Sequence, residues 1–139
     1  MAEALFSFGA PAFWDLVHGT RRIAIEAAAK TDLPLMIMTN CYTDPASAPL
    51  CARDREIVEN HGGTVCPVYL TCNMPEMTRR VTKASRQDRR KVGNPDMLNA
   101  YLTENNIAAV PDPRRIALST TIAPPQETAA IILKHFALE

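Results

Sequence analysis

Apolar residues recur at intervals of three and four over residues 11–30 and again over residues 124–138, and this spacing predicts an amphipathic helix in each range. Pro11 suits the first turn of a helix, where its missing N–H is not needed. We expect further helices at residues 50–63, which end in two glycines, and at residues 94–106, which open with an asparagine followed by proline. Periodicity or end signals thus indicate a helix in each of these ranges.

Three short segments between these helices read as strands, at residues 33–40, 64–72 and 115–121. The first is a continuous apolar run, which is typical of a strand buried on both faces. Pro67 lies inside the second segment and is unusual for a central strand, because proline cannot donate a ladder hydrogen bond. Alternating strands and helices indicate right-handed crossovers, so we predict an α/β fold in which a parallel sheet has helices on both faces.

A basic segment covers residues 79–92, RRVTKASRQDRRKV. Its first thirteen residues carry seven Lys or Arg side chains and one Asp, whereas the rest of the chain carries eight basic and fourteen acidic side chains. A positive field that is this local favours a small anionic ligand, since a long polyanion usually meets a broader basic face. Nucleic-acid binding is not expected, because no aromatic residue is interleaved to stack a base. A solvated helix face is the alternative.

The basic segment continues a helix that begins at Asn73, where Glu76 three residues later completes a capping-box pattern. Within the segment Arg86, Arg89 and Arg90 fall at i, i+3 and i+4, so on a helix they share one face. Guanidinium groups bind phosphate oxygens bidentately and stay charged. These three arginines are therefore the leading candidates for a site.

Length and composition indicate a single globular domain over residues 1–139. No apolar run approaches the length of a membrane helix, and the first residues lack the basic start of a signal peptide. The four cysteines lack zinc-ligand spacing, so we expect reduced thiols in a cytoplasmic protein and no metal site.

Several short patterns follow one another along the chain: a strand that ends in a polar residue, an HGG helix end, C-x-x-x-E-x-x-x-R at a helix start, and TT followed by E near the end. They lie in AFWDLVHGTRRIAIEAAAKTDLPLMIMTNCY, IVENHGGTVCPVYLTCNMPEMTRRV and LSTTIAPPQETAAIILKHF. In this order, and over nearly the whole chain, they resemble the carboxy-terminal part of the shikimate-kinase-like small P-loop kinases, which are P-loop NTPases often labelled AAA-family ATPases.

The resemblance implies a P-loop NTPase-like fold and the transfer of a phosphoryl group from ATP, with Mg, to a small hydroxyl-bearing acceptor. It makes residues 79–106 a lid-like helical insertion whose arginines, Arg86, Arg89 and Arg90, stabilise the transferring group. It also places the loop after the last strand beside the adenine, where the residues are Ser119, Thr120 and Thr121. The resembled kinases usually have Asp at the position of Ser119.

The phosphate cradle of such kinases, G-x-x-x-x-G-K-[ST], does not occur in this chain, whose five glycines never begin that pattern. Compared with the resembled kinases, the chain is expected to begin late and to be incomplete at its N-terminus, with three recognisable strands. An open sheet edge would then favour a homodimer. We expect the polypeptide alone neither to bind ATP tightly nor to transfer phosphate. The alternative is a non-enzymatic, degenerate α/β module that binds an anion or a protein partner.

Candidates for an acceptor site come from two segments. Trp14, Asp15 and Arg22 lie in the first predicted helix, which borders the acceptor pocket in the resembled kinases. Asn40 and Tyr42 follow the first predicted strand, and open parallel sheets bind ligands at the carboxyl ends of their strands. Core packing of Trp14 and solvation of Arg22 are the alternatives.

Overall fold

The computed structural model describes residues 2–31, 33–84 and 92–138 of the chain. Two compact units make up the chain. We call Met1–Asn40 with Pro45–Val65 the helical unit, and Cys41–Asp44 with Cys66–Glu139 the sheet unit. Among the described residues, no helix combines the length and the hydropathy needed to cross a lipid bilayer.

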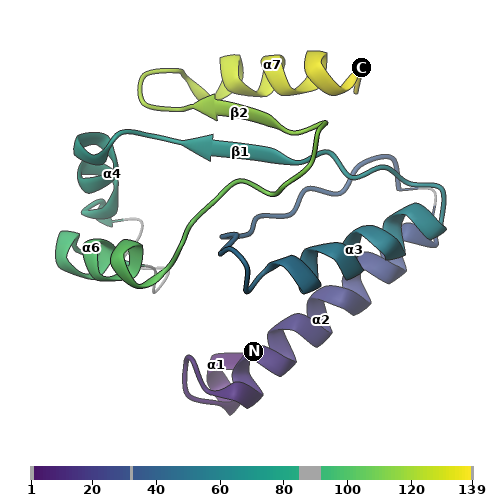
Figure 1. The fold of residues 1–139 in the computed structure, drawn as a ribbon, viewed down its shortest axis with the longest axis horizontal. Helices are drawn as coiled ribbons and strands as arrows, with labels where there is room; N and C mark the ends of the chain where they lie inside the picture. The colour runs from purple at the N-terminus through teal and green to yellow at the C-terminus, as the bar shows by residue number, and fades with distance from the viewer. Residues whose placement is uncertain (1, 32, 85–91, 139) are drawn as a thin grey trace. The chain divides into compact units, whose positions relative to one another are not determined.

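The helical unit contains α1 (Ala2–Leu5), α2 (Pro11–Ala29) and α3 (Ala48–Asn60), which are labelled in Figure 1. The two longer helices confirm the helices predicted at residues 11–30 and 50–63. The double glycine ends α3 as expected: Gly62 has a φ of 79°, a left-handed conformation that costs glycine little.

The helices α2 and α3 pack against each other. On α2, Phe13 and Ile25 are buried. The Nε of Arg21 lies 3.0 Å from Oδ2 of Asp54, and Asp54 is buried on α3. This ion pair therefore joins the two helices.

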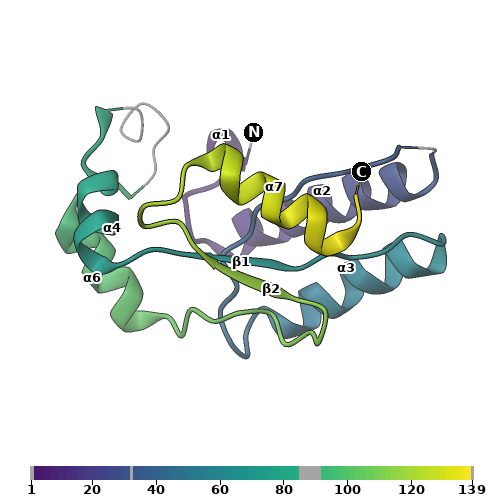
Figure 2. The same ribbon diagram turned by 90° about the horizontal axis from the view of Figure 1, so that it is seen from above.

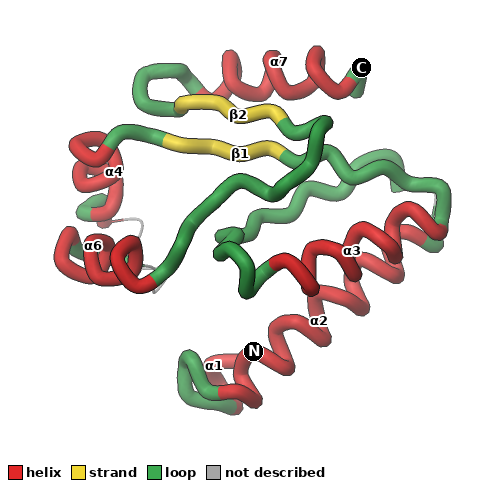
Figure 3. Tube along the Cα trace, viewed as in Figure 1, coloured by secondary structure: helices red, strands yellow, loops and turns green. Residues whose placement is uncertain are grey.

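Residues 33–40, predicted as the first strand, are not a strand in the structure. Figure 3 draws the connection between α2 and α3 as loop, and residues 35–40 have no regular secondary structure. Farther along, Thr43 and Ile107 of the sheet unit form an isolated antiparallel bridge. A strand requires a paired backbone partner, whereas an apolar run reports only a tendency to be buried. The prediction failed because the run says nothing about that partner.

The sheet unit contains a parallel pair of strands, β1 (Val68–Thr71) and β2 (Ile116–Ser119). Val68 is paired with Ile116 at one end and Thr71 with Ser119 at the other. These strands confirm, in shortened form, the predictions at residues 64–72 and 115–121. Pro67 precedes β1, so the N–H that proline lacks is not needed in the ladder between the two strands. Its carbonyl accepts a hydrogen bond from the Ile116 N–H at 3.1 Å.

Three helices of the sheet unit follow the predicted order: α4 (Met74–Val81), α6 (Pro95–Glu104) and α7 (Pro125–Phe136). Figures 1 and 2 show α4 and α6 side by side, and α7 packs along β2. The chain is therefore mixed α/β with parallel pairing in its described strands. The expected third strand and the P-loop NTPase-like architecture are not confirmed.

Candidate functional site

A hollow of about 600 Å³ lies in the sheet unit, and we call it the basic hollow. Its charged lining comes from Glu76, Arg79, Arg80 and Lys83, on and just after α4. Thr120, which follows β2, also lines it. The basic hollow therefore lies where the strands of the parallel pair end, the edge at which open parallel sheets bind ligands.

Hydrogen bonds hold the loop after β2 against the end of β1. The N–H of Thr120 donates to the carbonyl of Thr71 at 2.7 Å, and its hydroxyl donates to the same carbonyl at 2.9 Å. The N–H of Asn73, which precedes α4, donates to the hydroxyl of Thr121 at 3.0 Å. Backbone groups and two threonine hydroxyls thus fix this edge of the basic hollow.

The capping box predicted at the start of α4 is only half formed. The Asn73 side chain accepts a hydrogen bond from the Glu76 N–H at 3.0 Å, as the pattern requires. The Glu76 carboxylate, however, does not return to the cap. It accepts two hydrogen bonds from Arg79 at 2.6 Å each and one from the Nε of Arg80 at 2.6 Å. The carboxylate therefore pairs with the arginines at i+3 and i+4, and Glu76 lines the hollow with them.

The two arginines have different surroundings. Arg80 donates from Nη1 to the hydroxyl of Thr120 at 3.0 Å and from Nη2 to the carbonyl of the same residue, and its side chain is 36% exposed. Arg79 binds Glu76, and its side chain is 62% exposed. Arg80 therefore joins α4 to the loop after β2, whereas Arg79 presents its guanidinium to solvent.

The charges in the basic hollow stabilise one another but do not cancel. Hydrogen bonds lower the pKa of Glu76 to about 2, with the larger effect from Arg79 and the smaller from Arg80. The carboxylate therefore stays charged at neutral pH. The same pairing raises the pKa of Arg79. Arg79, Arg80 and Lys83 thus give three positive charges against the single negative charge of Glu76. An anion is the ligand that this excess favours.

Two groups of residues were predicted to contact the nucleotide, three arginines at its phosphates and the loop after the last strand at its adenine, and the structure describes only the second group. Arg86, Arg89 and Arg90 lie outside the described residues. Thr120 lines the basic hollow, and the hydroxyl of Ser119 donates to that of Thr121 at 3.1 Å. The structure thus brings the loop predicted to hold a cofactor next to the first arginines of the basic segment.

The predicted acceptor residues are divided between the two units. Trp14, Asp15, Arg22 and Asn40 belong to the helical unit, and Tyr42 belongs to the sheet unit. Trp14 stacks on His18 and contacts Phe8 and Phe13 edge-to-face, while Asp15 and Arg22 are exposed on α2. Asn40 donates to the sulfur of Cys51 at 3.9 Å.

Tyr42 is buried, with 5% of its surface exposed, and its hydroxyl donates to Asp44 at 3.3 Å. The same short segment, Cys41–Asp44, also contacts α6 of the sheet unit through its cysteine. A hydrogen bond with Cys41 is the main cause that raises the pKa of Tyr101 to about 12. Tyr42 itself contributes packing and a hydrogen bond within the sheet unit.

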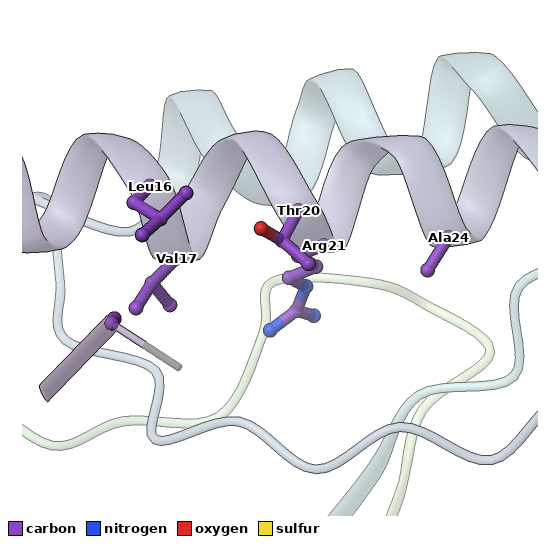
Figure 4. Close-up of a pocket in the computed structure, with 6 residues that line it drawn as sticks. Leu16, Val17, Thr20, Arg21 and Ala24 are labelled. Atoms are coloured by element: carbon purple, nitrogen blue, oxygen red, sulfur yellow. The ribbon is translucent and has the colours of Figure 1, made fainter. Parts of the chain in front are cut away.

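A second hollow, of about 270 Å³, lies along α2 in the helical unit (Figure 4). Leu16, Val17 and Ala24 give it a mostly apolar lining, and Arg21 supplies its charge. Arg21 already forms the ion pair with the buried Asp54. This hollow therefore has less positive charge available to an anion than the basic hollow has.

Glu76, Arg79, Arg80 and Lys83 were not singled out as site residues by the sequence, although the last three belong to the basic segment. The available signal was the Glu-x-x-Arg-Arg spacing, which places an acid one helical turn before two cations. Its position directly after a strand was the second signal.

Among residues 2–31, 33–84 and 92–138, no three His, Cys, Asp or Glu side chains gather as metal ligands. Comparison with protein-family models, with curated proteins and with solved structures found no match to this chain.

Proposed function

We propose that this chain is an anion-binding α/β module that holds the phosphate group of a small organic ligand in the basic hollow. The observation that carries the proposal is the excess of cations at the carboxyl ends of β1 and β2. Three cationic side chains and one carboxylate line a single hollow there. Guanidinium groups match phosphate oxygens in geometry, and an ammonium group adds a point charge.

The apolar part of the lining favours an organic ligand over inorganic phosphate. Leu70 of β1, together with Ala129 and Ile132 of α7, gives the basic hollow an apolar wall. Its volume of about 600 Å³ lies in the range of small-molecule sites. A phosphate monoester can place its charge near Arg79 and Lys83 while its carbon skeleton covers the apolar wall.

ATP-dependent phosphoryl transfer is a second candidate. It is favoured by the position of Thr120, because the resembled kinases use the loop after their last strand to hold the nucleotide. The sequence, however, has no G-x-x-x-x-G-K-[ST] cradle to hold the β- and γ-phosphates. We therefore propose binding without transfer, and we expect MgATP to bind no more tightly than a simple phosphate monoester.

Calorimetric titration of the full chain with phenyl phosphate tests the proposal. We expect a Kd of about 1 mM or lower. Affinity should fall as salt is raised, because exposed charges are screened. Lys83→Gln should weaken binding up to about five-fold, as expected for one exposed charge pair. Lys134→Gln removes the same charge from α7, outside the hollow, and should have no effect.

Absence of binding at low salt would refute the proposal, and so would equal losses in the two lysine variants. Micromolar binding of MgATP with weak binding of phenyl phosphate would instead favour the kinase-like candidate.

A further inference from the structure

We infer that the organic part of the ligand in the basic hollow is an alkyl or aryl group, so that the site selects apolar phosphate monoesters over sugar or nucleoside phosphates. This inference rests on the proposed anion-binding function and names its class of ligand. Apart from the charged residues and two threonines, the described residues that line the hollow are apolar: Leu70, Ala123, Pro125, Ala129 and Ile132. The threonines are therefore the uncharged hydrogen-bonding side chains of this lining.

The two threonines, Thr120 and Thr128, have no hydroxyl hydrogen left to donate to a ligand. The hydroxyl of Thr120 donates to the carbonyl of Thr71 at 2.9 Å, and that of Thr128 donates to the carbonyl of Pro124 at 3.2 Å. A hydroxyl has a single hydrogen, so each is used within the protein. Thr128 is also buried, with 7% of its surface exposed.

The charged side chains serve contacts within the hollow and the charged end of a ligand. Glu76 accepts hydrogen bonds from Nε and Nη2 of Arg79 and from Nε of Arg80, and Arg80 donates its other nitrogens to Thr120. Glu76 thus occupies one edge of the Arg79 guanidinium, and the edge formed by Nη1 and Nη2 is open to phosphate oxygens. Lys83 adds a positive charge in the same hollow.

The apolar wall gains from being covered by carbon atoms. Leu70 is 52% exposed although it lies in a paired strand, and Ala129 is exposed on α7. Removing apolar surface from water is favourable by about 25 cal/mol per Å². A hydroxyl group placed against this wall would instead lose water without gaining a hydrogen bond, which costs free energy. An alkyl or aryl group therefore gains affinity from the wall, and a sugar ring does not.

The inference is tested on the full chain at pH 7.5 with three phosphate monoesters, whose affinities are measured from amide chemical shifts. Cyclohexyl phosphate and myo-inositol 1-phosphate share a six-membered carbon ring, and the second carries a hydroxyl group on each remaining ring carbon. Methyl phosphate is the reference that lacks a ring. All three are mainly dianionic, because their second pKa is about 6. Cyclohexyl phosphate should bind about ten-fold more tightly than methyl phosphate. The inositol phosphate should bind no more tightly than methyl phosphate.

Two neighbouring isoleucines of α7 give a matched pair of variants. Ile132→Ala removes part of the apolar wall and should weaken cyclohexyl phosphate about three-fold while leaving methyl phosphate unchanged. Ile131 is 40% exposed and lies outside the residues that line the hollow, so Ile131→Ala should change neither affinity.

Equal binding of all three ligands by the wild type, or tighter binding of the inositol phosphate, would overturn the inference while the proposed function stands. This readout needs no variant to fold. Equal losses of cyclohexyl phosphate affinity in the two isoleucine variants would also overturn it. If the wild type binds neither cyclohexyl phosphate nor methyl phosphate, the proposed function fails and the inference fails with it.

Discussion

The hydrogen bonds from Arg80 on α4 to the loop after β2 should contribute measurably to the free energy of unfolding of the sheet unit. Arg80 donates to the hydroxyl of Thr120 at 3.0 Å and to the carbonyl of the same residue. A hydrogen bond from a charged donor contributes roughly 1.5–3 kcal/mol when it is buried, and less where solvent screens it. Because the Arg80 side chain is 36% exposed, we expect Arg80→Gln to destabilise the sheet unit by about 2 kcal/mol in total.

The assay must report on the sheet unit. The single tryptophan, Trp14, lies in the helical unit, so its fluorescence is unsuitable. Native-state hydrogen exchange of the β1 and β2 amides reports the opening of the strands directly. A loss of about 2 kcal/mol should accelerate their exchange roughly 30-fold.

Arg79→Gln is the matched control, because it makes the same change in charge at the neighbouring position. Arg79 binds the side chain of Glu76 and reaches no group of the β2 loop through a hydrogen bond within the described residues. It should leave the exchange of the strand amides close to wild type. Equal acceleration in both variants, or in neither, would refute the account in which Arg80 anchors α4 to the β2 loop.

Three further predictions concern local structure. Asn73→Ala removes the side-chain cap of α4, and Asn94→Ala removes that of α6. Each should lower the free energy of unfolding in urea by about 1 kcal/mol. A neutral result at either position would contradict the observed cap. Gly62→Ala should cost about 1 kcal/mol by the same assay, because its φ is 79°. The folded state depresses the pKa of Glu76 to about 2, so the stability it contributes is present above its usual pKa and is lost as pH falls towards 2. An acid titration of unfolding free energy should therefore be shallower in Glu76→Gln, and parallel curves would contradict the pairing.

Elements with local signals were predictable from the sequence. The caps at Asn73 and Asn94 both accept the expected backbone hydrogen bond, at 3.0 and 2.8 Å. The parallel pairing of β1 with β2 followed from the alternation of strands and helices. The segment at residues 33–40 has the same apolar character but is not a strand, because pairing depends on a neighbour that the run itself does not specify.

The sequence indicated the segment that carries the cations of the candidate site, but not the residues that line it. The charge asymmetry of the basic segment indicated an anion site, and the resemblance placed the loop after the last strand beside a nucleotide; Thr120 of that loop lines the basic hollow. The diversion of Glu76 from its cap to Arg79 and Arg80 could not be predicted, because a capping box and an i, i+4 ion pair compete for the same carboxylate. The contact from Arg80 to Thr120 links residues 40 positions apart, which no local pattern encodes.

The most direct test of the central claim is to map the binding of phenyl phosphate residue by residue with amide chemical shifts in the full chain. If the basic hollow is the site, saturable shifts should concentrate on residues 76–83 and 119–121, while the amides of α2 and α3 stay unchanged. Shifts centred on the helical unit, or weak shifts that do not saturate and are spread over the surface, would contradict the assignment of the basic hollow as an anion-binding site.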